Sequence, residues 1–214
     1  MTDIDVIFFD VDGTLVDSRK DIVKAINYTL RKLGLKERPG GQIVSYIGTG
    51  VKDLVKKSLG SENADLSDEA FKMFSDYYLA HATDESKLYP HVKETLEHFK
   101  TKRKFVLTNR YKRFADITLR GLGISDYFED IIGGDDENCL KPSRCVLDGF
   151  FKKLKINKAR AMMVGDMTID IMTGKNSGIK TCWVTYGLGK AEDVIPIKPD
   201  YIVDDIIKLK DIIR

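Results

Sequence analysis

The sequence predicts an α/β fold: a doubly wound parallel sheet with a Rossmann-like core and an inserted α-helical cap subdomain. Two observations carry this prediction. Short apolar runs, each followed by polar or glycine-rich positions, alternate with segments of helical periodicity. After the first apolar run, however, helical periodicity continues through residues 19–86 without an intervening strand.

The apolar runs predict the strands of the sheet. Ile131 and Ile132, which precede two glycines, predict one short strand. The other runs have the length and composition of buried parallel strands, and they comprise residues 4–9, 105–107, 161–164, 181–184 and 201–203. Helical spacing lies between several of these strands, at residues 112–122, 143–154 and 168–177. Gly123 and Gly178 follow the first and last of these helices, as is typical of helix ends.

The stretch from residue 19 to residue 86 predicts the inserted subdomain. Its apolar spacing predicts three successive helices. The first covers residues 22–33 and ends before Gly34, and the second is a short helix at 54–59. The third is capped by Ser67 and runs to about residue 82. One crossover between strands needs fewer helices, so we favour an insertion over a simple covering of the sheet. The predicted division is a core of residues 1–18 and 87–214 with a helical cap of residues 19–86. Its hinges are expected near residues 17–20 and 86–90.

Composition and charge narrow the function. The 214 residues carry 35 Lys and Arg against 33 Asp and Glu, a formal charge of +2, which gives no bulk attraction to nucleic acid or membrane surfaces. The N-terminus has neither the basic flank nor the longer apolar stretch of a signal peptide, and no run is long enough to span a membrane. We therefore expect a cytoplasmic protein, either a monomer or a homodimer.

The three cysteines, Cys139, Cys145 and Cys182, are odd in number and form no CxxC pair. This pattern argues against a disulfide framework and against a zinc site. We expect all three to be reduced thiols.

Polar residues cluster where the predicted strands end. Ligands of open α/β sheets bind outside the carboxyl ends of the strands, so these side chains are expected to surround one cleft. They are Asp10 and Asp12 after the first strand, Thr108 and Asn109 after the next, Asp166 and Asp170 after the strand at 161–164, and Lys141 in a preceding loop.

This clustering predicts phosphoryl chemistry with a metal ion. Carboxylates crowded at a buried strand end repel one another unless a cation lies among them, and oxygen ligands favour a hard cation such as Mg²⁺. Asp10 can then attack an electrophile while the metal offsets its repulsion from an anionic substrate. Gly13 permits a sharp turn that points backbone N–H groups toward substrate oxygens. Lys141, Thr108 and Asn109 supply the charge and the donors expected around a phosphoryl group.

Together these residues resemble the motifs of the haloacid dehalogenase superfamily, in particular its phosphatases with a helical cap inserted after the first motif. The resemblance covers nearly the whole chain and comprises four motifs in order, DVDGTLVDS at 10–18, LTN at 107–109, KP at 141–142 and VGDMTID at 164–170. Asp12, two positions after Asp10, is typical of the phosphoryl-transfer members rather than of the dehalogenases. One departure is Ser143, where many relatives have a second proline two positions after the lysine.

The resemblance implies a role for each residue. Asp10 is expected to be the nucleophile that forms an aspartyl-phosphate, and Asp12 the acid and base that protonates the leaving alcohol and later activates water. The Asp10 carboxylate, the Asp12 backbone carbonyl and Asp166 are expected to bind Mg²⁺. Asp170 is expected to orient a metal-bound water or Lys141 from behind the metal site. Thr108, Asn109 and Lys141 are expected to hold the phosphate oxygens.

The substrate is expected to be a small phosphorylated metabolite. Phosphoglycolate-phosphatase-like members have a similar glycine-rich cap segment over the site, which makes Thr49 and Lys52 candidates for substrate contact, although a simple turn and helix start explains the segment nearly as well. Arg110 follows Asn109 where relatives often carry Lys and is either a substrate-facing cation or a solvent-facing one. Phosphoglycolate is the best single expectation. The alternatives are a pyrophosphatase, a nucleotide or sugar-phosphate phosphatase, a β-phosphoglucomutase-like phosphotransferase, and a non-catalytic phosphate-binding regulator.

Overall fold

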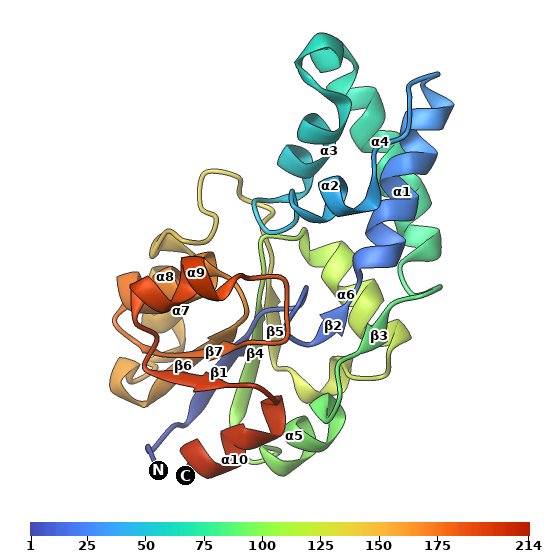
Figure 1. Ribbon diagram of the computed structural model, residues 1–214. Coiled ribbons are helices and arrows are strands. Elements are labelled where there is room, and N and C mark those ends of the chain that lie inside the picture. Colours follow the sequence, from blue (N-terminus) through green and yellow to red (C-terminus); the bar gives the residue numbers. More distant parts are fainter.

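A parallel sheet forms the centre of the molecule. The computed structural model describes residues 1–214. The strand order in the sheet is β5-β4-β1-β6-β7-β8, with all neighbours parallel (Figure 1). The strands are β1 (Val6–Phe9), β4 (Arg103–Leu107), β5 (Asp130–Ile132), β6 (Ala161–Gly165), β7 (Lys180–Val184) and β8 (Tyr201–Val203). The α/β fold class is therefore confirmed, and each predicted strand is present.

The order of the strands reverses at β1. From β1 the chain passes to β4 and β5 on one side and then returns to β6, β7 and β8 on the other. Phe8 is in register with Phe105 of β4 and with Met163 of β6, so β1 is hydrogen-bonded along both edges. Such a switch in direction leaves a crevice at the carboxyl end of the central strands. Asp10 follows β1 at this position.

Helices cover both faces of the sheet, which explains why the strands read as continuous apolar runs. Ile7 and Phe9 belong to the hydrophobic core on one face, whereas Val6 and Phe8 belong to the core on the other. The first core includes side chains of α5 (Val92–His98), α6 (Lys112–Gly121) and α10 (Leu209–Ile212). The second includes α7 (Cys145–Leu154). Two further helices, α8 (Thr168–Ser177) and α9 (Ala191–Val194), lie near β6 and β7 (Figure 1).

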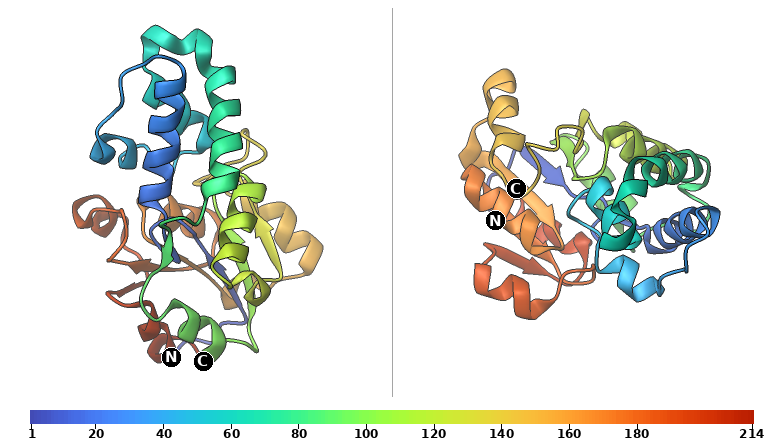
Figure 2. Two further views of the ribbon diagram at one scale, coloured as in Figure 1. Left: turned by 90° about the vertical axis from the view of Figure 1, so that its right-hand side faces the viewer. Right: turned by 90° about the horizontal axis from the view of Figure 1, so that it is seen from above.

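Four helices lie between β2 and β3 in the chain and stand above the carboxyl edge of the sheet (Figure 1). They are α1 (Arg19–Lys32), α2 (Gly40–Val44), α3 (Val51–Leu59) and α4 (Ser67–His81). The long helices α1 and α4 run side by side in both views of Figure 2. Apolar side chains of these helices and of the segments that join them form a separate hydrophobic cluster. Phe114 of α6 also belongs to this cluster. Of these helices, the sequence did not predict α2.

The chain passes between the sheet and these helices through a small antiparallel ribbon. The strands β2 (Val16–Asp17) and β3 (Lys87–Leu88) pair with each other, so the outgoing and returning segments lie together. Next to this ribbon, the buried Asp21 carboxylate accepts hydrogen bonds from the backbone N–H groups of Glu85 at 3.0 Å and Ser86 at 2.7 Å, and from the Ser86 hydroxyl at 2.6 Å. The first turn of α1 is thereby fixed to the returning chain.

Two local predictions are wrong. Ser67 does not cap α4: it is the first residue of that helix, and its hydroxyl donates a hydrogen bond at 2.6 Å to the carbonyl of Ala64 in the preceding 3₁₀ helix. Cys139 and Cys145 are not free thiols but form a disulfide, because the loop between them turns back and brings their Cα atoms to 5.8 Å. Cys182 is free and buried.

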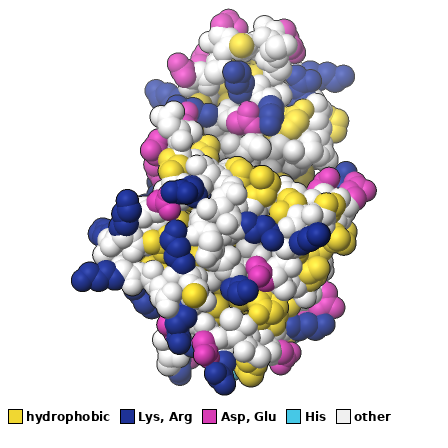
Figure 3. Space-filling view, turned by 90° about the vertical axis from the view of Figure 1, so that its left-hand side faces the viewer, with side chains coloured by type: hydrophobic (Ala, Val, Ile, Leu, Met, Phe, Trp, Pro, Cys, Tyr) yellow, Lys and Arg dark blue, Asp and Glu magenta, His cyan; other side chains and the backbone are white.

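Short 3₁₀ helices complete the structure at Ser61–Leu66, Ser125–Tyr127, Lys158–Arg160, Ile195–Ile197 and Ile206–Lys208. None of the helices has the length and apolar character needed to cross a membrane. On the face drawn in Figure 3, basic side chains are scattered among acidic, apolar and neutral ones and form no continuous patch.

Candidate active site

A pocket lies between the carboxyl ends of the central strands and the helices above them. Its lining includes seven of the residues that the sequence predicts for the site, namely Asp10, Asp12, Thr108, Asn109, Arg110, Lys141 and Asp170. The helical side contributes apolar side chains, which include Ile22, Leu54, Phe74 and Tyr78. Residues as far apart as 10 and 170 in the sequence therefore meet in one pocket.

Three buried carboxylates form the acidic centre of this site. Asp10, Asp166 and Asp170 each offer an oxygen within 4.8 Å of the others. Burial raises the pKa of Asp10 well above its ordinary value. Burial, and then the nearby Asp170, raise the pKa of Asp166 to about 7. A hard divalent cation would relieve this repulsion, and an all-oxygen donor set of this kind fits Mg²⁺.

Asp166 is held in one orientation by its neighbours. The Thr14 hydroxyl donates a hydrogen bond to Asp166 Oδ1 at 2.9 Å, and the backbone N–H of Leu188 donates to Oδ2 at 2.6 Å. Gly13 has a φ of +91°, and a Cβ atom there would lie 2.2 Å from Asp166 Oδ2. At Gly187 a Cβ atom would lie 2.3 Å from the Asp166 Cβ. Both glycines are thus required by the close approach of the backbone to this carboxylate.

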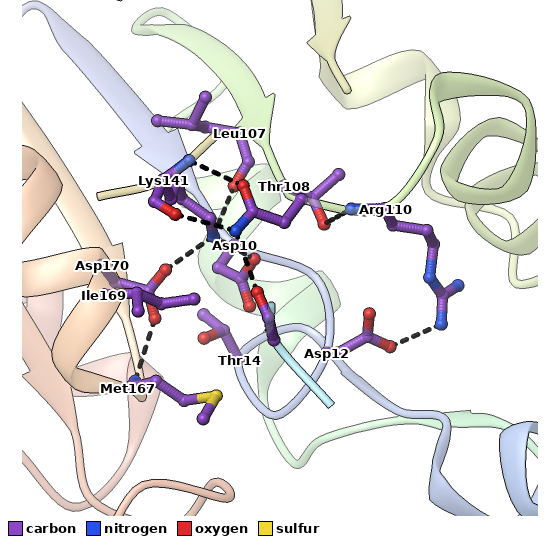
Figure 4. Close-up of polar contacts among 12 residues, drawn as sticks. Asp10, Asp12, Thr14, Leu107, Thr108, Arg110, Lys141, Met167, Ile169 and Asp170 are labelled. Atoms are coloured by element: carbon purple, nitrogen blue, oxygen red, sulfur yellow. Dashed lines mark hydrogen bonds and ion pairs between the residues drawn. The ribbon is translucent and has the colours of Figure 1, made fainter. Parts of the chain in front are cut away.

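Lys141 neutralises part of the acidic centre. Its Nζ atom lies 2.6 Å from Asp10 Oδ1 and 2.6 Å from Asp170 Oδ1, and it donates a third hydrogen bond to the Leu107 carbonyl at 3.1 Å (Figure 4). Burial alone would lower the pKa of this ammonium group, but the two carboxylates outweigh burial and raise the pKa above its usual value. Lys141 therefore stays a cation inside the pocket.

The loop that carries Lys141 is fixed at several points. The disulfide between Cys139 and Cys145 closes the loop around the lysine. At one end of α8, the Asn176 side chain donates to the Pro142 carbonyl at 2.8 Å. The Asn109 side chain accepts the Lys141 backbone N–H at 2.7 Å and donates to the Lys141 carbonyl at 3.0 Å. These contacts limit the movement of the lysine backbone.

Asn109 also reaches the segment before α3, since its side-chain amide donates a hydrogen bond to the Gly48 carbonyl at 2.9 Å. The side chain predicted to hold phosphate is thus engaged with backbone groups on two loops. Thr108, the other predicted phosphate ligand from this strand end, is buried at the pocket, and its hydroxyl accepts the Arg110 N–H at 3.1 Å.

Asp12 lies apart from the acidic centre and pairs with Arg110. The Arg110 Nη2 atom donates to Asp12 Oδ1 at 2.6 Å (Figure 4), and the Ser18 hydroxyl donates to the same oxygen. The Arg110 side chain is 5% exposed and that of Asp12 is 12% exposed. Arg110 also donates from Nη1 to the Thr118 hydroxyl at 3.0 Å, and its guanidinium lies 5.1 Å from the centre of the Tyr78 ring. Arg110 is therefore a buried residue of the pocket and does not face solvent.

The structure corrects the expectation for Thr49 and Lys52, neither of which lines the pocket. Thr49 is exposed, and its hydroxyl donates a hydrogen bond to the carboxylate of Asp53 in the first turn of α3. The Lys52 side chain is 53% exposed and pairs with Glu137 at 2.7 Å. Helix α3 presents Val51 and Leu54 to the pocket, so its polar side chains between them point outward.

Sequence reasoning missed two groups of site residues. Thr14, Gly187 and Leu188 orient Asp166, and only Thr14 belongs to one of the four motifs. The apolar wall formed by Phe74, Tyr78 and Phe114 was also missed, although Phe74 and Tyr78 have the i, i+4 spacing of one helical face.

Comparisons with known proteins agree with this geometry. A family model described as haloacid dehalogenase-like hydrolase matches residues 7–184. The chain is 34% identical to the phosphoglycolate phosphatase of Vibrio vulnificus (strain CMCP6), over 99% of this chain and 96% of that protein. It is 36% identical to the phosphoglycolate phosphatase of Aquifex aeolicus (strain VF5), over 96% of each. The crystal structure of a predicted phosphoglycolate phosphatase from Haemophilus somnus 129pt superposes with a TM-score of 0.91 at 29% identity, over 99% of both chains.

Proposed function

Because this chain belongs to the haloacid dehalogenase-like hydrolase family and is a phosphatase, we propose that it is a magnesium-dependent phosphomonoester hydrolase whose substrate is phosphoglycolate. The observation that carries the proposal is the buried contact of Lys141 with Asp10 and Asp170 beside Asp166. This arrangement places one fixed cation and one candidate metal site around a single carboxylate nucleophile.

Asp10 is the nucleophile of the proposed reaction. Its carboxylate oxygen attacks phosphorus, a bond forms between them, and the bond from phosphorus to the leaving oxygen breaks. Asp12 gives its proton to that leaving oxygen and in the second half-reaction takes a proton from water. The oxygen of this water bonds to phosphorus, the bond from phosphorus to Asp10 breaks, and inorganic phosphate leaves. Lys141 offsets the charge on the phosphoryl oxygens throughout.

The carboxylates of Asp10 and Asp166, together with the backbone carbonyl of Asp12, would hold Mg²⁺. When bound, the ion supplies positive charge that offsets the repulsion between Asp10 and the phosphoryl group. Asp170 accepts hydrogen bonds from Lys141 Nζ at 2.6 Å and from the Met167 N–H at 2.9 Å, so its proposed role is to position the lysine. Thr108 is proposed to hold a phosphate oxygen, and Asn109 to act through the loops that it joins.

The proposed division into a core of residues 1–18 and 87–214 and a cap of residues 19–86 has two supports. The helices α1 to α4 have their own hydrophobic cluster, and the chain enters and leaves them through one short ribbon. In this proposal the cap covers the phosphoryl site and supplies the apolar wall against which the leaving group lies.

Phosphoglycolate is favoured by the names of the full-length relatives and by the buried Arg110 on the leaving-group side. The alternative esters share the same phosphoryl site and differ in the leaving group. The presence of both Asp10 and Asp12 weighs against a non-catalytic phosphate-binding protein.

The proposal is tested by release of inorganic phosphate from phosphoglycolate, pyrophosphate, a nucleoside monophosphate and a hexose phosphate, with and without Mg²⁺. We expect phosphoglycolate to give the highest kcat/KM, and Asp10→Asn to abolish turnover while Asp116→Asn, a change at an exposed ion pair on α6, leaves it unchanged. A folded Asp10→Asn protein with normal turnover would refute the mechanism. A higher kcat/KM for another ester would refute the substrate alone.

A further inference from the structure

We propose that Arg110 exchanges one anion for another during the reaction: it holds Asp12 in the free enzyme and the negative group of the leaving alcohol in the complex. Binding of an anionic leaving group thereby releases Asp12 for proton transfer. This inference rests on the proposed function, and it adds a reason why the enzyme would turn over esters with anionic leaving groups faster than esters with neutral ones.

The first support is the position of Asp12 in the free protein. Figure 4 shows its carboxylate turned toward Arg110, and Oδ1 accepts hydrogen bonds from Arg110 and from Ser18. While Arg110 engages its Oδ1 at 2.6 Å, the Asp12 carboxyl group is turned away from the acidic centre where the phosphoryl group would bind. Asp12 must therefore leave this pair before it can protonate a leaving group.

The second support is the environment of Arg110. Its guanidinium is buried against Tyr78, and Phe74 and Phe114 also line this side of the pocket. An unpaired charge in such surroundings is strongly unfavourable. Asp12 is the carboxylate with which Arg110 forms an ion pair. Asp12 is thus released at low cost only when another anion takes its place.

The third support is that Arg110 has donors to spare. A guanidinium group has five N–H donors in a planar fork, and this fork matches the two oxygens of a carboxylate. The side-chain hydrogen bonds of Arg110 go to Asp12 and Thr118, which leaves donors that an arriving carboxylate can engage. The incoming group can therefore begin to bind before Asp12 departs.

The consequence is selectivity expressed in kcat. A neutral leaving group still allows the phosphoryl group to contact Lys141, but Asp12 remains paired with Arg110. Binding energy from a part of the substrate away from phosphorus is then used to free the proton donor, and a truncated substrate loses kcat as well as affinity.

The decisive experiment divides the substrate into two pieces. Methyl phosphate is phosphoglycolate without its carboxylate, and formate supplies that carboxylate separately. With the wild-type protein and Mg²⁺, we expect saturating formate to raise kcat for methyl phosphate by about tenfold or more, whereas chloride at the same ionic strength has no such effect. Because this arm uses the wild-type protein, it does not depend on the folding of a variant.

Arg110→Met supplies the second arm, with Arg120→Met, an exposed change on α6, as its control. We expect Arg110→Met to lose formate activation and to lower the ratio of kcat for phosphoglycolate to kcat for methyl phosphate well below that of the wild type. A purely structural role for Arg110 would instead lower both rates together.

The outcomes separate the inference from the function beneath it. Hydrolysis of phosphoglycolate without formate activation of methyl phosphate would overturn the inference and leave the phosphatase proposal intact. Formate activation that persists in Arg110→Met would also overturn it. If no phosphate ester is hydrolysed, the proposed function fails and the inference fails with it.

Discussion

Lys141 and Asp10 are 131 positions apart in the chain, yet the lysine Nζ lies 2.6 Å from the aspartate Oδ1 in a buried pocket. The topology explains this contact. After β5 the chain returns across the sheet to β6 on the other side of β1, and the loop before α7 therefore lies near the end of the central strand. The pair joins the proposed nucleophile to the cation that is proposed to bind the phosphoryl oxygens.

Removal of the Lys141 charge should impair catalysis more than folding. In Lys141→Met we expect kcat/KM for the best phosphoester to fall by about a hundredfold or more, because a positioned charge at the phosphoryl oxygens is lost. Steady-state phosphate release measures this, with Lys100→Met at an exposed position as the control. A folded Lys141→Met protein within a few-fold of wild type would contradict the role assigned to the lysine.

Magnesium should stabilise the protein more at high pH than at low pH. Burial raises the pKa of Asp10, and raises that of Asp166 from 3.8 to about 7, so the folded state holds these protons more tightly than the unfolded state. Their contribution to stability is complete below the unfolded value and is lost as the pH rises through about 7. In EDTA, we therefore expect Tm to fall as the pH rises from about 5 to about 8, because these two carboxyl groups lose their protons. Mg²⁺ should raise Tm more at the higher pH, because Asp10 and Asp166 must be deprotonated to bind the ion.

Thermal denaturation over that pH range tests this prediction, with Tm measured in Mg²⁺, in Ca²⁺ and in EDTA. Ca²⁺ prefers longer bonds and more ligands, so a smaller gain is expected from it. An Mg²⁺ effect that is equal at both pH values would contradict the assignment of these carboxylates as ligands.

The contacts around Asp166 should control the metal affinity. In Thr14→Val the hydrogen bond to Asp166 Oδ1 is lost, and we expect the apparent affinity for Mg²⁺ to weaken by about 10- to 100-fold, with a smaller change in kcat at saturating metal. Activity measured against Mg²⁺ concentration tests this. Gly13→Ala should be inactive at every concentration, because its Cβ would occupy the position of the Asp166 carboxylate. An unchanged dependence of activity on Mg²⁺ concentration in Thr14→Val would show that the Thr14 hydroxyl does not contribute to metal affinity.

The junction between core and helices should depend on Asp21. Asp21→Ala leaves the buried backbone N–H of Ser86 without its 2.7 Å partner, and we expect a loss of about 1–3 kcal/mol in the free energy of unfolding. Denaturant titration measures the loss. Asp68→Ala, in the first turn of α4, provides a control at an exposed acidic residue. Equal stability of the two variants would refute the anchoring role.

The sequence predicted the sheet and the residues at its carboxyl edge because both depend on local patterns. The run at β1 is apolar on both faces, and Asp10 follows it directly, so the strand and the position of the carboxylate are visible together. A parallel sheet then brings other strand ends, such as Asn109 and Asp166, to the same edge.

The remaining features depend on tertiary contacts. Lys52 is a flexible surface side chain. It forms an ion pair with Glu137 and does not enter the pocket because of the way α3 is rotated against the core. The pairing of Cys139 with Cys145 depends on the path of a loop that has no periodic pattern. In the same way, the contact of Tyr78 with Arg110 exists only because α4 packs near α6.

The central claim is that Asp10 becomes covalently phosphorylated. The most direct measurement is acid quench during turnover, followed by borohydride reduction, which converts an aspartyl-phosphate to homoserine, and then peptide mass spectrometry. We predict homoserine at position 10 in the wild type with Mg²⁺ and phosphoglycolate, and none in Asp10→Asn or without substrate. Turnover without modification at position 10, or modification at another carboxylate such as Asp12 or Asp166, would contradict the account.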